Sequence, residues 1–221
     1  FYAAGGVQVL LKALTPLLDL DAMTITGETM GEWVRKADEP AQWQDTISTL
    51  AAPKGPPGSL VVLRGSLAPR GAVIKVAAAT PALLTHRGRA VVFDSIEDLE
   101  SMDDREIEAD DILVLRNAGP VASGMPEAGA FPIPRRLARA GVKDMVRISD
   151  ARMSGTAFGT VVLHVAPEAA IGGPIALVRD GDIIELDASA GRLDLMVPEE
   201  QLAQRRAALT EFVSPERGWR R

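Results

Sequence analysis

Short apolar segments recur along the chain between residues 60 and 197, with few long stretches of helical periodicity between them. They run 60–63, 72–76, 90–93, 112–115, 145–148, 160–165, 175–178, 183–186 and 192–197. Many short strands joined by short helices are typical of a barrel or a sandwich rather than a doubly wound sheet. We therefore expect an α+β, mostly β fold in which a β-barrel-like domain carries short flanking helices.

A stretch rich in Pro, Gly and Ala covers residues 51–59 and includes Pro53, Pro56 and Pro57. Such composition indicates a connection between structured parts. We place a domain boundary there. Residues 1–58 form a helical linker segment, and residues 59–221 form the β-barrel-like domain.

The linker segment shows two helical patterns. Apolar residues at 7, 10, 11 and 14 share one helical face, and Pro16 ends or restarts that helix. A second helix is expected from Glu28 to about Ala37, with Thr26 as its N-cap. If these two helices have no chemical role, the linker segment is a plain helical hairpin.

Near the other end of the chain, residues 198–212 predict a helix with Pro198 near its start and Leu202 and Leu209 as packing positions. The pair Arg205 and Arg206 is expected on its outer face. Between two apolar runs, residues 180–182 read Asp-Gly-Asp and predict a solvent-exposed hairpin turn.

Composition excludes several classes of function. The net charge of −6 argues against a nucleic acid or an anionic membrane as the main partner, and no apolar run approaches the roughly 20 residues that span a bilayer. We expect a soluble, cytoplasmic protein. There is no cysteine, so the chain has neither disulfides nor a thiolate metal site, and with only two histidines, His86 and His164, we expect no self-contained zinc site.

An acidic stretch follows residue 94 and could suggest a metal site. A short helix capped by Ser95 is expected at 95–104, and carboxylates occur at positions 98, 100, 103, 104, 106 and 108. These carboxylates point in several helical directions, so we interpret them as a solvated face.

The turn after the apolar run 145–148 has the features of a site. Small and polar residues fill it, and Ser154 and Thr156 stand two residues apart across Gly155 before the next apolar run, 160–165, begins. Two hydroxyls and several backbone N–H groups can converge there on one small anion. The alternative is a structural turn with capping hydroxyls.

A longer pattern surrounds this turn. Residues 149–156 read Ser-Asp-Ala-Arg-Met-Ser-Gly-Thr, and residues 164–170 and 172–182 continue with His-Val-Ala-Pro-Glu-Ala-Ala and Gly-Gly-Pro-Ile-Ala-Leu-Val-Arg-Asp-Gly-Asp. This pattern closely resembles the C-terminal domain of the dihydroxy-acid and sugar-acid dehydratases, which include 6-phosphogluconate, arabinonate and xylonate dehydratases. The resemblance implies that the barrel-like part is a swivelling C-terminal domain.

Two further stretches carry the same resemblance. Residues 65–75 resemble the Gly-Asn-Leu-Ala-Pro segment of the family, with Ser66 in place of asparagine, which puts a hydrogen bond of that amide in doubt. Lys75 within it either reaches an acidic group or faces solvent. Residues 116–127 resemble the Gly-Pro and Gly-Met-Pro-Glu element, in which the glutamate, here Glu127, is a magnesium ligand; otherwise Glu127 caps the following helix.

The resemblance also implies a reaction and its cofactors. It implies an iron-sulfur and magnesium dependent hydro-lyase that converts an aldonate to a 2-keto-3-deoxy acid, with a cluster of the 2Fe-2S type held by cysteines outside this chain. Ser154 occupies the position of the base, Thr156 binds substrate or orients Ser154, and Gly155 lies between them in the substrate-binding loop. The implied partners are the chain's own N-terminal domain and further copies in a homodimer or homotetramer.

Alternatives to the sugar-acid reaction remain. One is the dihydroxy-acid dehydratase of branched-chain amino-acid biosynthesis, although residues 151–159 are closer to the sugar-acid branch. Another is a non-catalytic β-domain that serves as an interaction module. The chain begins with Phe1 and shows no signal peptide, so we interpret it as a piece trimmed at both ends and inactive in isolation.

Overall fold

The computed structural model describes residues 1–55, 58–124, 131–152, 154, 158–210 and 212–213. Contacts between residues divide the chain into two compact units, Phe1–Pro57 and Gly58–Arg221. Within the described residues no helix combines the length and the apolar character needed to cross a bilayer.

The first unit is helical. Its elements are η1 (Tyr2–Ala4), α1 (Gly6–Ala13), η2 (Thr15–Leu17) and α2 (Met30–Arg35). The buried side chains of Ala4, Val9 and Ile47 form its small core, and Leu10 and Ala13 pack against them. The face predicted for the first helix is therefore only partly right: Leu10 contacts this core, but Val7 is exposed and Val9 is the buried residue of α1. Nζ of Lys12 donates to the carbonyl of Ala37 over 2.7 Å and ties α1 to the end of α2.

The prediction that Thr26 caps the second helix is wrong. Thr29 is the N-cap of α2, since its hydroxyl accepts from the backbone N–H of Glu32 and the carboxylate of Glu32 accepts from that of Thr29. This reciprocal pair satisfies two N–H groups that a helix start leaves without partners. The hydroxyl of Thr26 instead contacts that of Thr24.

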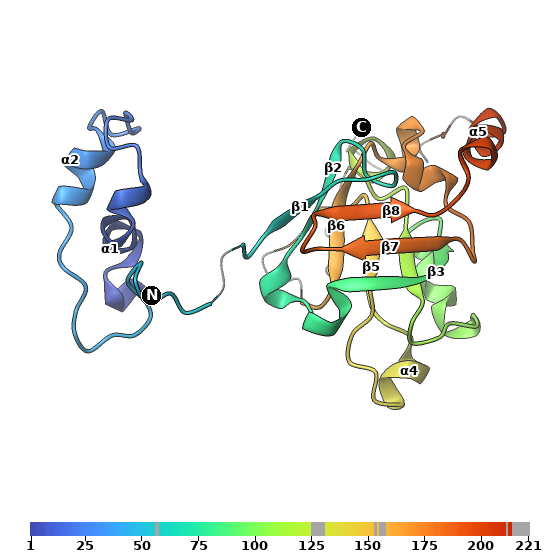
Figure 1. The fold of residues 1–221 in the computed structure, drawn as a ribbon, viewed down its shortest axis with the longest axis horizontal. Coiled ribbons are helices and arrows are strands. Elements are labelled where there is room, and N and C mark those ends of the chain that lie inside the picture. Colours follow the sequence, from blue (N-terminus) through green and yellow to red (C-terminus); the bar gives the residue numbers. More distant parts are fainter. Residues whose placement is uncertain (56–57, 125–130, 153, 155–157, 211, 214–221) are drawn as a thin grey trace. The chain divides into compact units, whose positions relative to one another are not determined.

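The second unit is an eight-stranded sheet that curls into a nearly closed barrel (Figure 1). Its strands are β1 (Val61–Leu63), β2 (Gly71–Ile74), β3 (Thr85–Phe93), β4 (Ile112–Leu115), β5 (Arg147–Ser149), β6 (Val161–Ala166), β7 (Ile183–Asp187) and β8 (Arg192–Leu195). The spatial order is β1-β2-β6-β5-β4-β3-β7-β8. The predicted mostly β, barrel-like fold is confirmed, but residues 175–178 are not a strand: they belong to the 3-10 helix η8 (Pro174–Leu177).

The barrel closes where the chain leaves β1. Arg64 forms a parallel bridge with Arg192 at the start of β8, and its backbone N–H donates to the carbonyl of Gly191 over 2.8 Å. Beyond it, the hydroxyl of Ser66 accepts from the backbone N–H of Leu195 over 2.8 Å. The two edge strands are thereby joined, so Ser66 has a structural role that a hydroxyl can fill.

Strand β4 is buried along its whole length because it has a core on each side. Ile112 and Val114 point into the core inside the barrel, which also contains Leu63, Ile74 and Leu193 among others. Their neighbours Leu113 and Leu115 join a second core outside the sheet, with Phe93, Met102, Phe131, Leu137 and Met145. The alternation of side chains along a strand explains how one short apolar run serves both cores.

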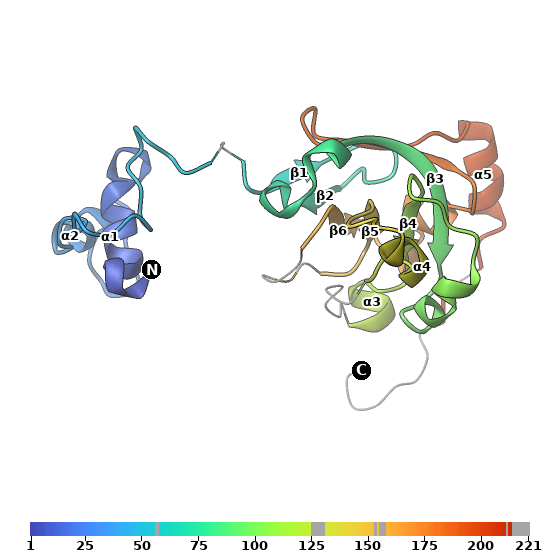
Figure 2. The same cartoon turned by 90° about the horizontal axis from the view of Figure 1, so that it is seen from below.

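Four neighbouring strands, β6, β5, β4 and β3, run parallel to one another. Strands β2 and β1 continue the sheet in antiparallel fashion on one side, as β7 and β8 do on the other. Figure 2 shows the parallel strands from below, with the helices that follow them. Because parallel strands end at the same edge, the segments after β3, β4, β5 and β6 leave the sheet together.

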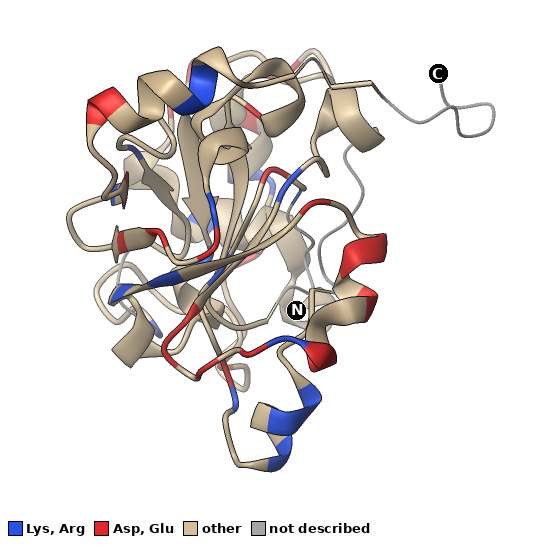
Figure 3. Cartoon of the chain, turned by 90° about the vertical axis from the view of Figure 1, so that its right-hand side faces the viewer, with Lys and Arg blue, Asp and Glu red and all other residues tan. Residues whose placement is uncertain are grey.

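Short helices occupy the connections. They are η3 (Val76–Ala78), η4 (Pro81–Leu83), η5 (Glu97–Asp104), α3 (Pro120–Ser123), α4 (Arg135–Arg139), η7 (Ala169–Ile171), η8 and α5 (Glu199–Ala207). The acidic residues of η5 and the basic residues of α4 are visible in Figure 3. A carboxylate of η5, Asp103, accepts from the first backbone N–H of α4, that of Arg135, over 2.7 Å.

The prediction for Arg205 is wrong, and the prediction of an exposed Asp-Gly-Asp turn holds for Asp180 and Gly181 but not for the side chain of Asp182. Arg205 does not lie on the outer face of α5: only 7% of its side chain is exposed, and it forms an ion pair with Asp182 of the Asp-Gly-Asp turn. Arg205 also donates to the carbonyl of Leu177 over 2.9 Å. The turn therefore fastens the last helix to the barrel, and only Arg206 of the arginine pair is exposed.

Candidate functional site

Polar residues follow each of the four parallel strands at the edge where these strands end. Asp94 follows β3, Arg116 and Asn117 follow β4, Asp150 follows β5, and Glu168 comes two residues after β6. Ligand sites of parallel sheets lie outside the carboxyl ends of the strands. This edge is therefore the candidate site, and it lies beside the turn that contains Ser154.

Asp150 joins three of these segments. The residue is 1% exposed, and its Oδ1 accepts from the backbone N–H of Ala118 and its Oδ2 from that of Ala169, each over 2.9 Å. Burial raises the pKa of Asp150, the two N–H groups oppose the increase, and the neighbouring charge of Glu168 adds to it. Asp150 thus fixes the loop after β4 and the turn after β6 to the end of β5.

Glu168 strengthens the same junction. Its buried carboxylate accepts from the backbone N–H of Val121 through both oxygens, over 2.9 and 3.2 Å. Val121 lies at the start of α3, where a carboxylate also satisfies a helix N–H that lacks a partner. The cis peptide Ala166–Pro167 precedes this residue.

Ser154 lies in the segment that leaves this junction. It is half-buried and comes four residues after Asp150. The backbone N–H of His164 donates to the carbonyl of Ala151 over 2.9 Å, so the chain still runs beside β6 three residues before Ser154. The other predicted site residues, Gly155, Thr156 and Glu127, lie outside the residues that the structure describes.

His164 is the titratable residue of β6, and its backbone N–H is the group that contacts the segment leading to Ser154. Its backbone has a φ of 55°, in the left-handed region that residues other than glycine seldom adopt. Burial lowers the pKa of its imidazole, and the positive charge of Arg152 lowers it further. His164 is therefore held toward its neutral form.

A second junction lies at the opposite, amino-terminal end of β5 and β6. The guanidinium of Arg147 donates to the carbonyls of Phe131 and Phe158, and it pairs with the carboxylate of Asp144. The sequence pattern did not reveal this junction or the one around Asp150 and Glu168. One signal was present, since Arg147 is a charged residue inside an otherwise apolar run, where a charge requires a partner.

The residues that the structure describes do not by themselves make a metal or cluster site. The chain has no cysteine, so an iron-sulfur cluster has no thiolate ligand here. Among the described residues no group of three His, Asp or Glu side chains could hold a metal ion, the acidic residues of η5 included. Glu127, for which the resemblance implies a role as magnesium ligand, is outside those residues.

A groove of about 620 Å³ lies at the edge where β3 and β4 end. One wall is polar and carries Asp94, Arg116 and Asn117. The other wall comes from the turn after β6 and from the chain after α5, with Ile171 and Leu209 among its apolar side chains. The groove adjoins the Asp150 junction, because Ala169 lines it as well.

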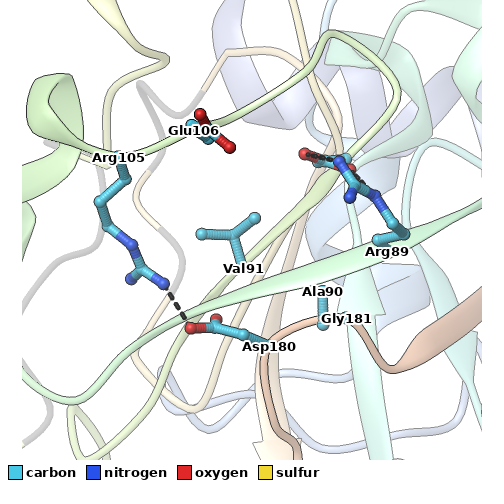
Figure 4. Close-up of a pocket in the computed structure, with 8 residues that line it drawn as sticks. Arg89, Ala90, Val91, Arg105, Glu106, Asp180 and Gly181 are labelled. Carbon is cyan, nitrogen blue, oxygen red and sulfur yellow. Dashed lines mark hydrogen bonds and ion pairs between the residues drawn. The ribbon is translucent and has the colours of Figure 1, made fainter.

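A smaller pocket of about 260 Å³ lies away from this edge, beside the middle of β3 (Figure 4). Two arginines line it, and each has an acidic partner: Arg89 pairs with Asp111 over 3.0 Å, and Arg105 with Asp180 over 2.6 Å. Their charges are compensated within the protein, so the pocket gives no indication of an anion site.

The sequence allowed two roles for Lys75, an interaction with a partner group or exposure to solvent. Lys75 is half-buried at the position preceding η3, and it has an interaction partner, so it is not a free solvent-facing lysine.

Comparison with known proteins agrees with the pattern around Ser154. The chain is 50% identical over 216 residues to 6-deoxy-6-sulfo-D-gluconate dehydratase of Pseudomonas putida, covering 94% of this chain and 37% of that protein. It is 48% identical to L-arabonate dehydratase of Azospirillum brasilense, covering 97% and 38%. A dihydroxy-acid dehydratase of Methanothrix thermoacetophila is 42% identical, covering 93% and 38%.

The chain thus spans well under half the length of these relatives. The family model described as dihydroxy-acid/6-phosphogluconate dehydratase C-terminal matches residues 45–221, which include the whole barrel. Because this match covers most of the chain and includes the residues that surround Ser154, the chain belongs to the dihydroxy-acid/6-phosphogluconate dehydratase family as its C-terminal domain.

Proposed function

We propose that the protein containing this chain is a sugar-acid dehydratase, which removes water from an aldonate and gives a 2-keto-3-deoxy acid. The observation that carries the proposal is the ranking of relatives: two sugar-acid dehydratases are 48–50% identical to the chain, and a dihydroxy-acid dehydratase is 42% identical. The position of Ser154 after a parallel strand supports it, since loops at such strand ends commonly carry site residues.

The proposed reaction begins with removal of a proton from the carbon next to the substrate carboxylate. The hydroxyl on the following carbon leaves, and with a proton it becomes the released water. The resulting enol then tautomerises to the 2-keto acid. The proton is weakly acidic, so the site has to stabilise the negative charge that develops on the substrate.

We assign the base to Ser154 and the binding of substrate to the loop of Ser154, Gly155 and Thr156. A serine hydroxyl is a poor base unless its surroundings favour the alkoxide, which makes this the most demanding part of the proposal. Thr156 hydrogen-bonds the substrate or orients Ser154. The iron-sulfur cluster and magnesium are cofactors in this proposal, with Glu127 as this chain's ligand to magnesium and all other ligands outside the chain.

The test is 2-keto acid formation by the protein of the complete reading frame, purified without air. The substrates are a panel of pentonates and hexonates, 6-deoxy-6-sulfo-D-gluconate and 2,3-dihydroxyisovalerate. Turnover of a sugar acid at a kcat/KM well above that for 2,3-dihydroxyisovalerate is the expected result. Preference for 2,3-dihydroxyisovalerate would instead assign the protein to branched-chain amino-acid synthesis.

The absence of turnover on the whole panel would contradict the proposal, provided that iron, sulfide and magnesium are bound. That result would favour the alternative in which the barrel serves as a non-catalytic interaction module.

A further inference from the structure

The guanidinium of Arg147 donates hydrogen bonds to three backbone carbonyls. Nη1 donates to the carbonyl of Phe131 over 2.7 Å, Nη2 to that of Phe158 over 3.1 Å, and Nε to that of Met145 over 3.3 Å. The side chain is 12% exposed. Every nitrogen of the group therefore has an acceptor in a mostly buried setting.

The carbonyls of Phe131 and Phe158 belong to different connections. Phe131 lies in the connection from β4 to β5, four residues after Glu127, and Phe158 lies in the connection from β5 to β6, four residues after Ser154. One planar group thus fastens both connections on the side away from the strand ends. Asp150 fastens the same two connections at the strand ends, since it begins one of them and accepts from Ala118 in the other.

Asp144 sets the orientation of this guanidinium. Its Oδ1 lies 3.0 Å from Nη2 of Arg147, while Oδ2 accepts from the hydroxyl of Thr80 over 2.7 Å and from both the backbone N–H and the hydroxyl of Thr160, over 2.8 and 2.7 Å. Asp144 is 4% exposed. The carboxylate is held from several sides, so it leaves the guanidinium little freedom to turn.

The chain passes directly against this ion pair at Gly159. A Cβ atom there would lie 2.2 Å from Nη2 of Arg147 and 2.5 Å from Oδ1 of Asp144, and the residue has a φ of +93°. Both the space and the backbone conformation require glycine. The contact is thus built into the fold at the position where the Ser154 segment returns to β6.

We propose that Arg147, oriented by Asp144, is a positioning residue for the dehydration reaction. It fixes the connection from β4 to β5 at Phe131 and the connection from β5 to β6, which carries Ser154, at Phe158. The inference rests on the proposed function, because it assumes that these two connections act on one substrate. Displacement of a reacting group by about 1 Å can lower the rate by about 10²-fold.

The test compares two conservative variants of the full-length protein, Arg147→Lys and Arg205→Lys. Arg205 is the matched control, because it too is a buried arginine that pairs with an aspartate and donates to a backbone carbonyl, here that of Leu177. Lysine keeps the charge in both variants but lacks the planar fork that reaches several acceptors. Both variants are assayed below their unfolding temperatures, with rates normalised to bound iron.

For Arg147→Lys we expect kcat to fall by about 10²-fold with KM within about threefold of the wild type, because binding is kept while alignment is lost. Arg205→Lys is expected to keep kcat within about twofold. Hydrogen exchange should be faster in Arg147→Lys than in Arg205→Lys for the peptides that contain Phe131 and Phe158.

Three results would overturn the inference while leaving the proposed function in place. They are wild-type kcat in Arg147→Lys, an equal loss of kcat in Arg205→Lys, and a loss of kcat in Arg147→Lys without faster exchange in those peptides. A wild-type protein that turns over no sugar acid would overturn the proposed function first, and the inference with it.

Discussion

Gly119 lies so close to Glu168 that a Cβ atom on residue 119 would come within 1.9 Å of Oε2 and 2.8 Å of Cβ of the glutamate. The backbone of the loop after β4 therefore lies directly against the side chain of Glu168 in the turn after β6. The contact allows Glu168 to reach the backbone N–H of Val121. The absence of a side chain at residue 119 thus allows two of the connections at the candidate site to pack closely together.

The substitution Gly119→Ala should lower the free energy of unfolding. The φ of residue 119 is −79°, which alanine adopts readily, so the effect would come from the clash alone. Glu168 cannot simply move aside, because its carboxylate is buried and bonded to the backbone. We expect a loss of about 1–3 kcal/mol, measured by urea unfolding of the full-length protein.

Gly55→Ala is the control for this substitution, because its added Cβ would meet nothing within 4 Å and the residue has no positive φ. Equal unfolding free energies for Gly119→Ala and Gly55→Ala would contradict the predicted clash.

The acid dependence of stability should include a contribution from Asp144. Burial alone would raise the pKa of this carboxyl, but hydrogen bonds from Thr80 and Thr160 and the charge of Arg147 together hold it below the ordinary value of 3.8. A carboxyl group whose pKa is lowered in the folded state stabilises the protein at pH values above 3.8. This stabilisation is lost as the pH falls through the lowered pKa. The stability advantage of wild type over Asp144→Asn should therefore shrink between about pH 5 and pH 2.

Asp150 should show the opposite dependence. Burial raises the pKa of Asp150 above 3.8, with a further contribution from Glu168. A carboxyl group whose pKa is raised in the folded state stabilises the protein at pH values below 3.8. This contribution is lost as the pH rises through the raised pKa. The stability of wild type relative to Asp150→Asn should therefore decrease as the pH rises from 3.8. Chemical denaturation of both variants over one pH series measures the two slopes together, and slopes of the same sign would contradict one of the assignments.

The sequence predicted the elements that depend on local composition. The run 112–115 matches β4 residue for residue, because a strand with a core on each face is apolar throughout. The run 175–178 is equally apolar, yet Pro174 begins a 3-10 helix there. A short apolar run cannot distinguish the two structures by its periodicity.

The junctions at the candidate site were beyond a sequence pattern for a different reason. The carboxylate of Asp150 accepts hydrogen bonds from two backbone N–H groups that are 32 and 19 residues away in the chain. Their proximity is created by the parallel pairing of β4, β5 and β6. The motif around Ser154 could be found from the sequence because its residues are consecutive, whereas the residues that hold it in place are not.

The two neighbouring arginines of α5 should differ sharply in their importance for stability. Arg205→Met leaves Asp182 buried without its partner, and removing one member of a buried ion pair costs about 3–5 kcal/mol. Arg206→Met changes an exposed side chain of the same helix and should stay within about 0.5 kcal/mol of wild type. Thermal unfolding of both variants checks this, and similar losses would show that the Asp182 contact contributes little.

The proposed role of Ser154 makes the most direct prediction about activity. Ser154→Ala in the full-length protein should abolish sugar-acid dehydration, with a loss of at least about 10²-fold in kcat, because the group assigned to take the substrate proton is gone. Iron, sulfide and magnesium contents should stay normal, since the serine is not proposed as a ligand. Ser189→Ala is the control, because Ser189 lies in the exposed turn after β7 and its hydroxyl donates to the carboxylate of Asp187. Substantial turnover by Ser154→Ala with full cofactor content would remove Ser154 from the role of base and leave Thr156 as the hydroxyl to test next.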